Sequence, residues 1–182
     1  MAKFFPALDA KLSDFIRKQH IFFTATAAAS GRINLSPKGL DSFRIIDENT
    51  VAWLNLTGSG NETAAHLKAV NRMTVMFCSF EKNPLILRLY GSADTIHQTH
   101  KRWQELYALF PPDPGARQIF VMTVESVQTS CGYAVPFYKF QKEREVLTAF
   151  AERKGEEGLR EYWDEKNRKS IDGLPTGIEE NF

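Results

Sequence analysis

The middle of the chain is dominated by β-prone segments that only one short helical stretch interrupts, and this pattern restricts the fold most strongly. The predicted strands of this middle part cover 21–27, 32–36, 43–46, 51–56, 73–80 and 85–96, and a final strand, 116–130, follows later in the chain. The helix predicted among them spans 62–70. Alternating βαβ units would place a helix between most pairs of strands, whereas a barrel accounts for a series of strands with one inserted helix. We therefore predict a mainly β fold with flanking helices.

The flanking helices are expected at 8–19 and 97–110, where apolar side chains recur at helical spacing. From 141 to 167 the chain becomes charged and helix-prone, and two glycines divide this stretch into two pieces. We expect 1–140 to form the barrel domain and 141–182 to form a helical extension packed on it. The last, turn-forming residues are expected to be ordered only where something tethers them.

Composition excludes several classes of partner. The 182 residues carry 23 Lys and Arg against 22 Asp and Glu, so no excess charge favours nucleic acid or an anionic membrane. The two cysteines lie far apart, and the four histidines form no recognised ligand pattern, so no metal site is expected. The sequence contains neither a long apolar run nor a signal-peptide pattern. We expect a cytoplasmic protein.

Residues 54–67, LNLTGSGNETAAHL, pass from a strand through a turn rich in glycine and hydroxyl groups into a helix start. Asn61 is a suitable N-cap, and free backbone N–H groups at a helix start attract anions. With the hydroxyls of Thr57, Ser59 and Thr63, this junction would hold a phosphate ester without a lysine. The alternative is that Asn61 simply caps a helix and the glycines make a tight connection. The local sequence leaves both interpretations open.

Three strings carry a resemblance to a known family, namely NLSPKG at 34–39, LNLTGSGNET at 54–63 and SCGYAVP at 130–136. With the order of elements, they resemble the pyridoxamine 5′-phosphate oxidase-like, FMN-binding split-barrel family over roughly residues 10–140. The chain is more similar to the broad, oxidase-related branch than to the vitamin B6 oxidase itself. The resemblance implies a six-stranded split β-barrel with FMN in a groove between two subunits, and hence a homodimer.

The resemblance also implies which residues bind the cofactor. Side chains at alternate positions of 34–38 share one face of a strand, which in the family borders the flavin phosphate and ribityl chain. The strand end at 54–57 matches the family's contacts to the isoalloxazine edge, and 59–63 matches its phosphate-binding helix start. The residues expected at the cofactor are Asn34, Ser36, Lys38, Asn55, Leu56, Thr57, Ser59, Gly60, Asn61 and Thr63. Without the family, Lys38 reads equally well as a solvated loop lysine.

Two departures from the vitamin B6 oxidase matter. That enzyme has a Ser-Arg-Lys triplet at the helix start, where this chain has 61–63, Asn-Glu-Thr, so two cations are missing. If Glu62 faced the site, it would repel a phosphate. The missing charge is expected from Lys38, Arg44 or Arg88. Arg88 lies in a very apolar strand, and a buried arginine needs an anion, either a flavin phosphate across the dimer or a structural ion pair. We include Arg88 among the cofactor-binding residues.

The second departure lies after 136, where the chain lacks the basic, tryptophan-containing motif that holds the substrate phosphate in the vitamin B6 oxidase. Oxidation of pyridoxamine phosphate is therefore not expected. The leading hypothesis is an FMN-dependent oxidoreductase that acts on an unknown small molecule, with few dedicated catalytic side chains. The alternative is a non-catalytic flavin- or haem-binding protein on the same barrel.

Overall fold

The structure is a computed structural model that describes residues 2–182. Within this range eight strands form one antiparallel sheet: β1 (Lys3–Phe5), β2 (Phe22–Thr26), β3 (Asn34–Lys38), β4 (Phe43–Ile45), β5 (Thr50–Leu56), β6 (Met73–Cys78), β7 (Ile86–Ile96) and β8 (Ala116–Ser130). The helical elements of the same range are α1 (Ala10–Arg17), α2 (Glu62–Ala69), α3 (Trp103–Tyr107), α4 (Val146–Lys166) and the 3₁₀ turn η1 (Ile178–Asn181).

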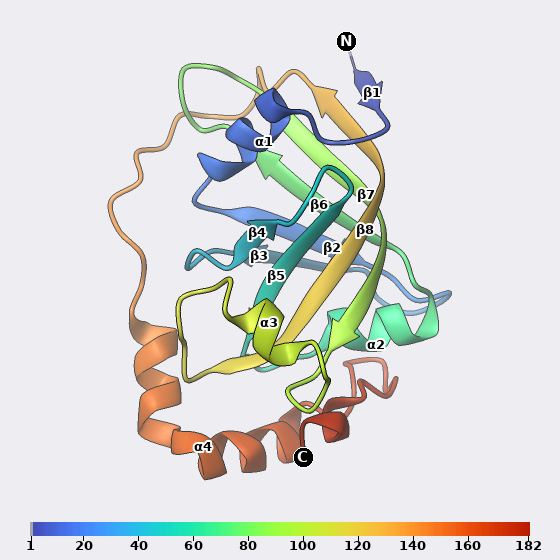
Figure 1. Cartoon of the computed structure of the whole chain (residues 1–182), viewed down its shortest axis with the longest axis vertical. Helices are drawn as coiled ribbons and strands as arrows, with labels where there is room; N and C mark the ends of the chain where they lie inside the picture. Colours follow the sequence, from blue (N-terminus) through green and yellow to red (C-terminus); the bar gives the residue numbers. More distant parts are fainter. Residues whose placement is uncertain (1) are drawn as a thin grey trace.

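The sheet curls into a barrel because its long strands bend at bulges (Figure 1). The strand order is β3-β2-β6-β7-β8-β5-β4, with β1 paired to β8. The register shifts at Tyr90/Gly91 in the β7–β8 pair and at Asn55/Leu56 in the β5–β8 pair. A bulge adds one residue to one strand and increases the local twist. A Cβ at Gly91 would lie 1.9 Å from the carbonyl oxygen of Thr123, so this close approach requires glycine.

The core follows from alternation along the strands, which sends apolar side chains inward. Trp53, Phe77 and Phe120 are among its largest buried residues. Helix α1 lies over one end of the barrel, and α2 and α4 lie at the other end (Figure 1). No helix of residues 2–182 is long and apolar enough to cross a membrane.

The predicted fold class, mainly β with flanking helices, is confirmed, and six strands have five or more residues. Two three-residue strands add to the six that the resemblance implies: β4, which the sequence predicted at 43–46, and β1, which it did not. The helix expected at 97–110 is shorter, because α3 covers only Trp103–Tyr107. Tertiary contacts hold the preceding residues in turns: the backbone N–H of Gln98 donates to Asn181 Oδ1, and the Gln98 amide donates to the carbonyl of Ala116.

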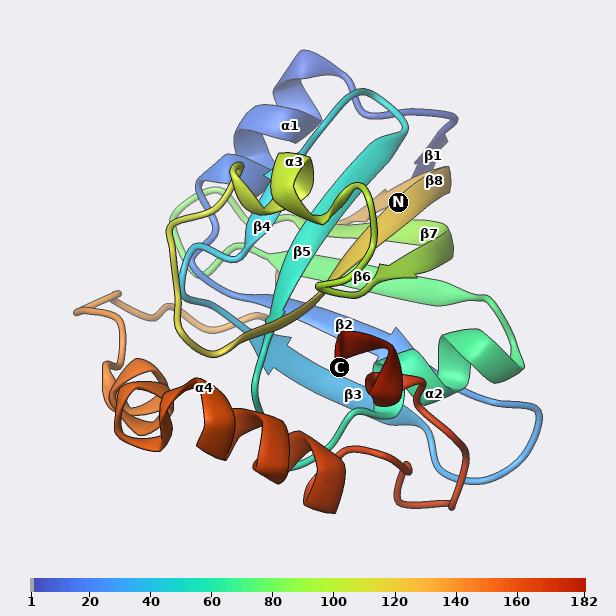
Figure 2. The same cartoon turned by 60° about the horizontal axis from the view of Figure 1, so that its bottom comes forward.

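The C-terminal residues follow the end of the barrel that carries β3 and the start of α2 (Figure 2). Helix α4 is broken at Gly155, whose φ is +67°. The tail beyond α4 is tethered to the barrel, because Asp172 pairs with Arg32 and the backbone N–H of Ile171 donates to the Glu62 carboxylate at 3.0 Å. These contacts join segments that lie far apart in the sequence.

Candidate functional site

A hollow of about 630 Å³, here called the polar pocket, lies between β3, the turn from β5 into α2, and residues 166–171. Nine residues that the sequence assigned to the cofactor line it: Asn34, Ser36, Lys38, Asn55, Leu56, Ser59, Gly60, Asn61 and Thr63. The structure therefore brings most of the expected set together. Their roles toward a cofactor stay predictions.

Side chains alternate between the two faces of β3, so every second residue lies on the face that lines the polar pocket. Asn34, Ser36 and Lys38 are half-buried, while the two residues between them are exposed. The amide of Asn34 donates to Thr63 Oγ1 at 3.2 Å, and Ser36 Oγ donates to Asn34 Oδ1 at 2.9 Å. The first of these hydrogen bonds ties β3 to the first turn of α2, so the two walls of the polar pocket are fixed relative to each other.

Thr57 does not line the polar pocket. Its side chain is 1% exposed and points into the junction with the C-terminal extension. The Thr57 hydroxyl donates to the carbonyl of Gly115 and accepts from Trp163 Nε1, each at 2.9 Å. Both hydrogen-bonding roles of the hydroxyl are thus taken by the protein. Thr57 anchors the extension to the strand end instead of facing a ligand.

Two of the three cations expected to supply the missing charge lie elsewhere. Arg44 pairs with Asp41 at 2.9 Å. Arg88 is on β7, which β2 and β6 separate from β3, and its side chain donates to Ser130 Oγ at 3.3 Å. In the single chain its side chain is half-buried, and its expected place at a flavin across the dimer stays a prediction. It forms no ion pair with any residue between 2 and 182.

Arg117 is the cation that sequence reasoning missed. It is the extra residue of the bulge in β8, since Asn55 pairs with Gln118 and Leu56 pairs with Ala116. A bulge can re-aim a side chain. The one available signal is weak, namely an arginine two residues before the apolar run 119–122.

The guanidinium of Arg117 holds the turn between β5 and α2. It donates to the carbonyl of Gly60 at 3.1 Å and to that of Gly58 at 3.4 Å. A third hydrogen bond, of 2.6 Å, goes to Asn167 Oδ1. The side-chain nitrogen of Asn167 in turn donates to the carbonyl of Gly58. All these acceptors are neutral, and Arg117 is only 2% exposed. Burial lowers the pKa of Arg117 to about 9, so the side chain is charged at neutral pH.

Lys38 is the second cation of the polar pocket. Burial, together with the nearby charge of Arg117, lowers the pKa of Lys38 to about 8. Its ammonium lies 5.2 Å from the centre of the Trp53 ring, a cation–π distance. Neither Lys38 nor Arg117 forms an ion pair within the described part of the chain. The interpretation of Lys38 as a solvated loop lysine therefore does not hold.

The start of α2 also differs from expectation. Helix α2 begins directly after Asn61, but the Asn61 side chain makes no capping hydrogen bond. Its backbone ψ of 41° departs from the extended conformation that lets an N-cap side chain reach the next turn. Asn61 is 2% exposed, and neither its amide nitrogen nor its oxygen has a partner among residues 2–182. This helix start therefore presents unbonded polar groups beside the polar pocket.

Glu62 lines the polar pocket, and its carboxylate is also hydrogen-bonded to the C-terminal tail. Its two carboxylate oxygens accept the backbone N–H of Ile171 at 3.0 and 3.2 Å. The charged group of Glu62 is therefore hydrogen-bonded to the C-terminal tail. The pocket wall still contains Glu62, and the cations of the lining that form no ion pair within residues 2–182 are Lys38, Arg117 and the exposed Lys169.

Comparisons with known proteins agree with this fold. The family model described as pyridoxamine 5′-phosphate oxidase matches residues 8–131. The Aspergillus flavus protein ustO, described as a pyridoxamine 5′-phosphate oxidase family protein, is 36% identical over 195 aligned residues. That alignment covers 96% of this chain and 78% of ustO.

Among solved structures, a Lactobacillus delbrueckii protein studied as a candidate pyridoxamine 5′-phosphate oxidase superposes with a TM-score of 0.56 at 18% identity, covering 68% of this chain and 94% of that one. HupZ of Group A Streptococcus gives a TM-score of 0.50 at 21% identity, covering 66% and 91%. At such identities the likeness shows the fold. From the family-model match and the similarity to ustO, the chain belongs to the pyridoxamine 5′-phosphate oxidase family.

Proposed function

We propose that the protein is an FMN-binding oxidoreductase that holds the flavin phosphate in the polar pocket. The main support is a pair of cations, Lys38 and Arg117, that no carboxylate of residues 2–182 neutralises. Both lie beside the N-terminus of α2. A phosphate ester would neutralise these charges, and the helix start would add backbone N–H donors.

The other groups of the polar pocket fit this ligand. The side-chain amide of Asn61 and Nε of Arg117 are buried without a partner in the described chain, and such groups are rare unless something binds them. The hydroxyls of Ser59 and Thr63 lie at the same helix start. A volume of about 630 Å³ falls within the usual range for small-molecule sites. The residues present therefore fit a phosphate ester.

In this proposal each part of FMN is contacted by its own set of residues. Ser59, Gly60, Asn61 and Thr63 would hold the phosphate together with Lys38. Following the family, Asn34 and Ser36 would line the ribityl chain, and Asn55 and Leu56 would face the flavin edge. When bound, FMN supplies the electron transfer, while the chain supplies binding, orientation and exclusion of competing reactions. Lys38 and Arg117 take the place of the two cations missing from the helix start.

A homodimer is part of this proposal, because family members hold FMN in a groove between two subunits. Two exposed apolar residues on or next to β3, Ile33 and Leu35, are compatible with a subunit contact. Sedimentation of the purified protein is expected to report two chains. A stable monomer that still binds FMN at micromolar concentration would contradict the dimer.

The cofactor is tested by titrating the purified protein with FMN and with riboflavin, which lacks the phosphate. We expect FMN to bind at least about tenfold more tightly, which corresponds to about 1.4 kcal/mol. The bound flavin should bleach with a reductant and recover in air. Equal affinities for the two flavins would remove the phosphate from the polar pocket, and failure to bind either would refute the proposal.

The same spectra separate the alternative function. A flavin that binds but does not return to the oxidised form with any acceptor indicates a carrier, and a Soret band indicates haem. Of the described residues that line the polar pocket, none is His, Cys, Met or Tyr, the usual protein ligands of haem iron. The polar pocket thus favours a phosphate over a haem.

A further inference from the structure

A second hollow, of about 880 Å³ and here called the apolar pocket, lies beside the first. One wall belongs to the barrel and consists of residues 18–21, 37–40 and 80–81. The other wall comes from 138–147 and from the first part of α4. This second wall lies beyond the segment 8–131 that the family model matches. The apolar pocket is therefore built largely by the chain's C-terminal extension.

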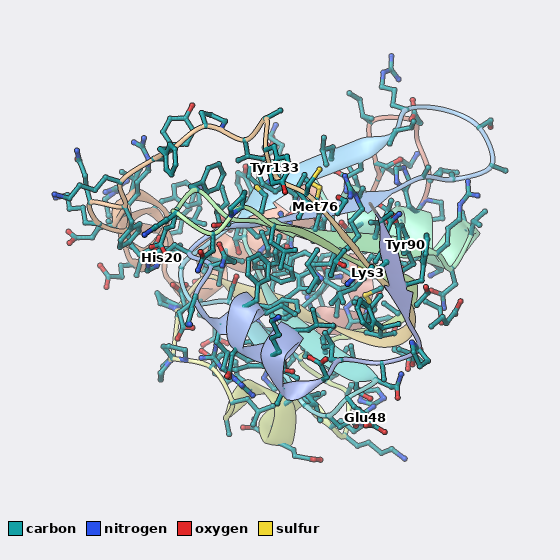
Figure 3. All side chains as sticks on the ribbon, turned by 90° about the horizontal axis from the view of Figure 1, so that it is seen from above. Lys3, His20, Glu48, Met76, Tyr90 and Tyr133 are labelled. Carbon is teal, nitrogen blue, oxygen red and sulfur yellow. The ribbon has the colours of Figure 1, made fainter. Side chains whose placement is uncertain are left out.

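The second wall, here called the outer wall, touches the barrel through a few aromatic contacts. The Phe140 ring stacks on His20 with 3.8 Å between ring centres, and the Tyr138 ring lies 5.4 Å from that of Phe80. The backbone N–H of Tyr138 donates to the carbonyl of Phe80 at 3.2 Å. Figure 3 shows His20 on the flank where the chain runs from β8 to α4, far from Tyr90 on the opposite flank. The apolar pocket is the space between the outer wall and the barrel beside these contacts.

The aromatic side chains of this wall are unusually exposed. Tyr138 is 68% exposed and Phe140 is 46% exposed, although both rings border the hollow. Residues 139–145 have no regular secondary structure. Exposed rings around a concave surface are typical of a site that a ligand covers.

Most of the charged side chains that line the apolar pocket are positive. Six cations line it: Lys18, Lys38, Lys139, Lys142, Arg144 and Arg153. The acidic side chains of the lining are Glu81 and Glu143. None of the six cations forms an ion pair anywhere in residues 2–182. Aromatic walls with a ring of unpaired positive charge are complementary to an apolar molecule that carries an anionic group.

The two pockets meet at Lys38, which lines both. Directly after Lys38 and Gly39, the chain adopts a left-handed backbone at Leu40 (φ 59°) and Asp41 (φ 50°). Such conformations are costly for non-glycine residues and tend to persist at binding sites. The backbone N–H of Leu40 faces Glu143 of the opposite wall at 3.4 Å. A molecule in the apolar pocket would thus lie next to a flavin in the polar pocket.

We propose that the apolar pocket is the substrate site and takes a flat, mostly apolar organic anion. Its role beside the flavin rests on the proposed function, whereas binding of the anion itself does not. The charge complementarity of the lining favours such an anion over a segment of a second chain.

The test uses two fluorescent probes with the full-length protein: anilinonaphthalene sulfonate, which is flat, apolar and anionic, and its uncharged counterpart phenylnaphthylamine. We expect one sulfonate probe per chain, bound about tenfold more tightly than the neutral probe because of the charge. Phe140→Ala should weaken the sulfonate probe several-fold. Phe137→Ala, which removes an exposed ring outside the lining, should not.

A matched pair of charge variants on α4 sharpens this test. Arg153 lines the apolar pocket, and its neighbour Lys154 does not. Arg153→Gln should weaken the anionic probe and leave the neutral one unchanged, while Lys154→Gln should change neither. Because both residues are exposed, neither variant is expected to disturb folding.

Several results would overturn the proposal. Equal affinity for the two probes, or equal effects of Arg153→Gln and Lys154→Gln, would remove the anion specificity. Displacement of the probe by FMN would make the apolar pocket part of the flavin site, and loss of probe binding as the chain dimerises would make a second copy the occupant. If FMN does not bind but the two probes and the variants behave as expected, the anion site is supported and only the proposed flavin function is refuted.

Discussion

The two pockets meet at one lysine but are built in different ways. The polar pocket is formed by β3, the turn from β5 into α2, Arg117 of β8 and residues 166–171, and hydrogen bonds such as those from Arg117 to Gly58 and Gly60 join these parts. The outer wall of the apolar pocket comes from a segment without regular structure and is held to the barrel mainly by ring contacts.

This difference indicates a division of labour. Recognition of a phosphate needs donors held in fixed positions, which regular elements joined by hydrogen bonds provide. Recognition of an apolar ligand depends on contact area and tolerates a wall that adjusts. Substitutions in the polar pocket are therefore expected to change stability and affinity steeply, and substitutions in the outer wall of the apolar pocket are expected to have smaller effects.

The largest effect is expected for Arg117→Met. The substitution leaves the carbonyl of Gly60 and the side chain of Asn167 without their buried donor, at a cost of about 3 kcal/mol. For a chain of this size, the melting temperature should fall by roughly 6–12 °C. FMN affinity should fall by about a hundredfold, while the sulfonate probe still binds the apolar pocket well below the melting temperature. Unchanged thermal unfolding and FMN titrations would contradict the role of Arg117.

The next effect concerns the hydroxyls at the start of α2. Replacing Ser59 and Thr63 by alanine removes two neutral hydrogen bonds to the phosphate, about 1–3 kcal/mol in total. FMN affinity should weaken by about one to two orders of magnitude in fluorescence titrations. Riboflavin should be nearly indifferent to the change. Equal losses for both flavins would place the phosphate outside the polar pocket.

A smaller effect, one that depends on pH, is expected for Lys38. Its pKa of about 8 means that the ammonium loses its charge as the pH rises from 7 to 9. FMN affinity should therefore fall over this range, approaching about tenfold per pH unit above the pKa. Lys38→Met should bind FMN more weakly at pH 7 and show no such decline, and Lys38→Arg should stay flat and tight. A decline that persists in Lys38→Met would assign the pH dependence to another group.

The same pKa shift has the opposite effect on folding without FMN. The unfolded chain keeps the Lys38 proton up to its ordinary pKa of 10.5, whereas the folded chain releases it near 8. Because the unfolded state binds more protons between these values, the contribution of Lys38 to the free energy of unfolding should rise with pH across this window. Denaturant unfolding of wild type and Lys38→Met at pH 8 and 10 measures the difference.

The smallest effect is expected for Arg88→Met. Arg88 lies outside both pockets, and its side chain makes one hydrogen bond, of 3.3 Å, to Ser130. The melting temperature should change by no more than about 2 °C, as for most surface substitutions, and FMN affinity should stay at its wild-type value. A clear loss of FMN affinity would restore the sequence-based assignment of Arg88 and place it at a flavin through the partner subunit.

Local patterns in the sequence were sufficient for much of the fold. The switch from an apolar, β-prone run to a glycine-rich turn and a helix start predicts the junction at 54–67, because strand and helix propensities are properties of neighbouring residues. Alternation along the strand placed Asn34, Ser36 and Lys38 on one face of β3. The family resemblance added the expectation that this face and this junction meet, and in the structure both line the polar pocket.

The sequence could not determine which arginine completes the polar pocket. Local composition favours Arg88, which lies between two leucines, over Arg117, which lies between an alanine and a glutamine. β8 pairs with β5, and a bulge in that pair turns Arg117 toward the carbonyls of the following turn, whereas β7 is not a neighbour of β5. In the same way, Glu62 meets Ile171 and Thr57 meets Trp163 only because the C-terminal extension returns to the barrel. Pairing between distant segments, which no local period encodes, therefore decided where the charges of the site lie.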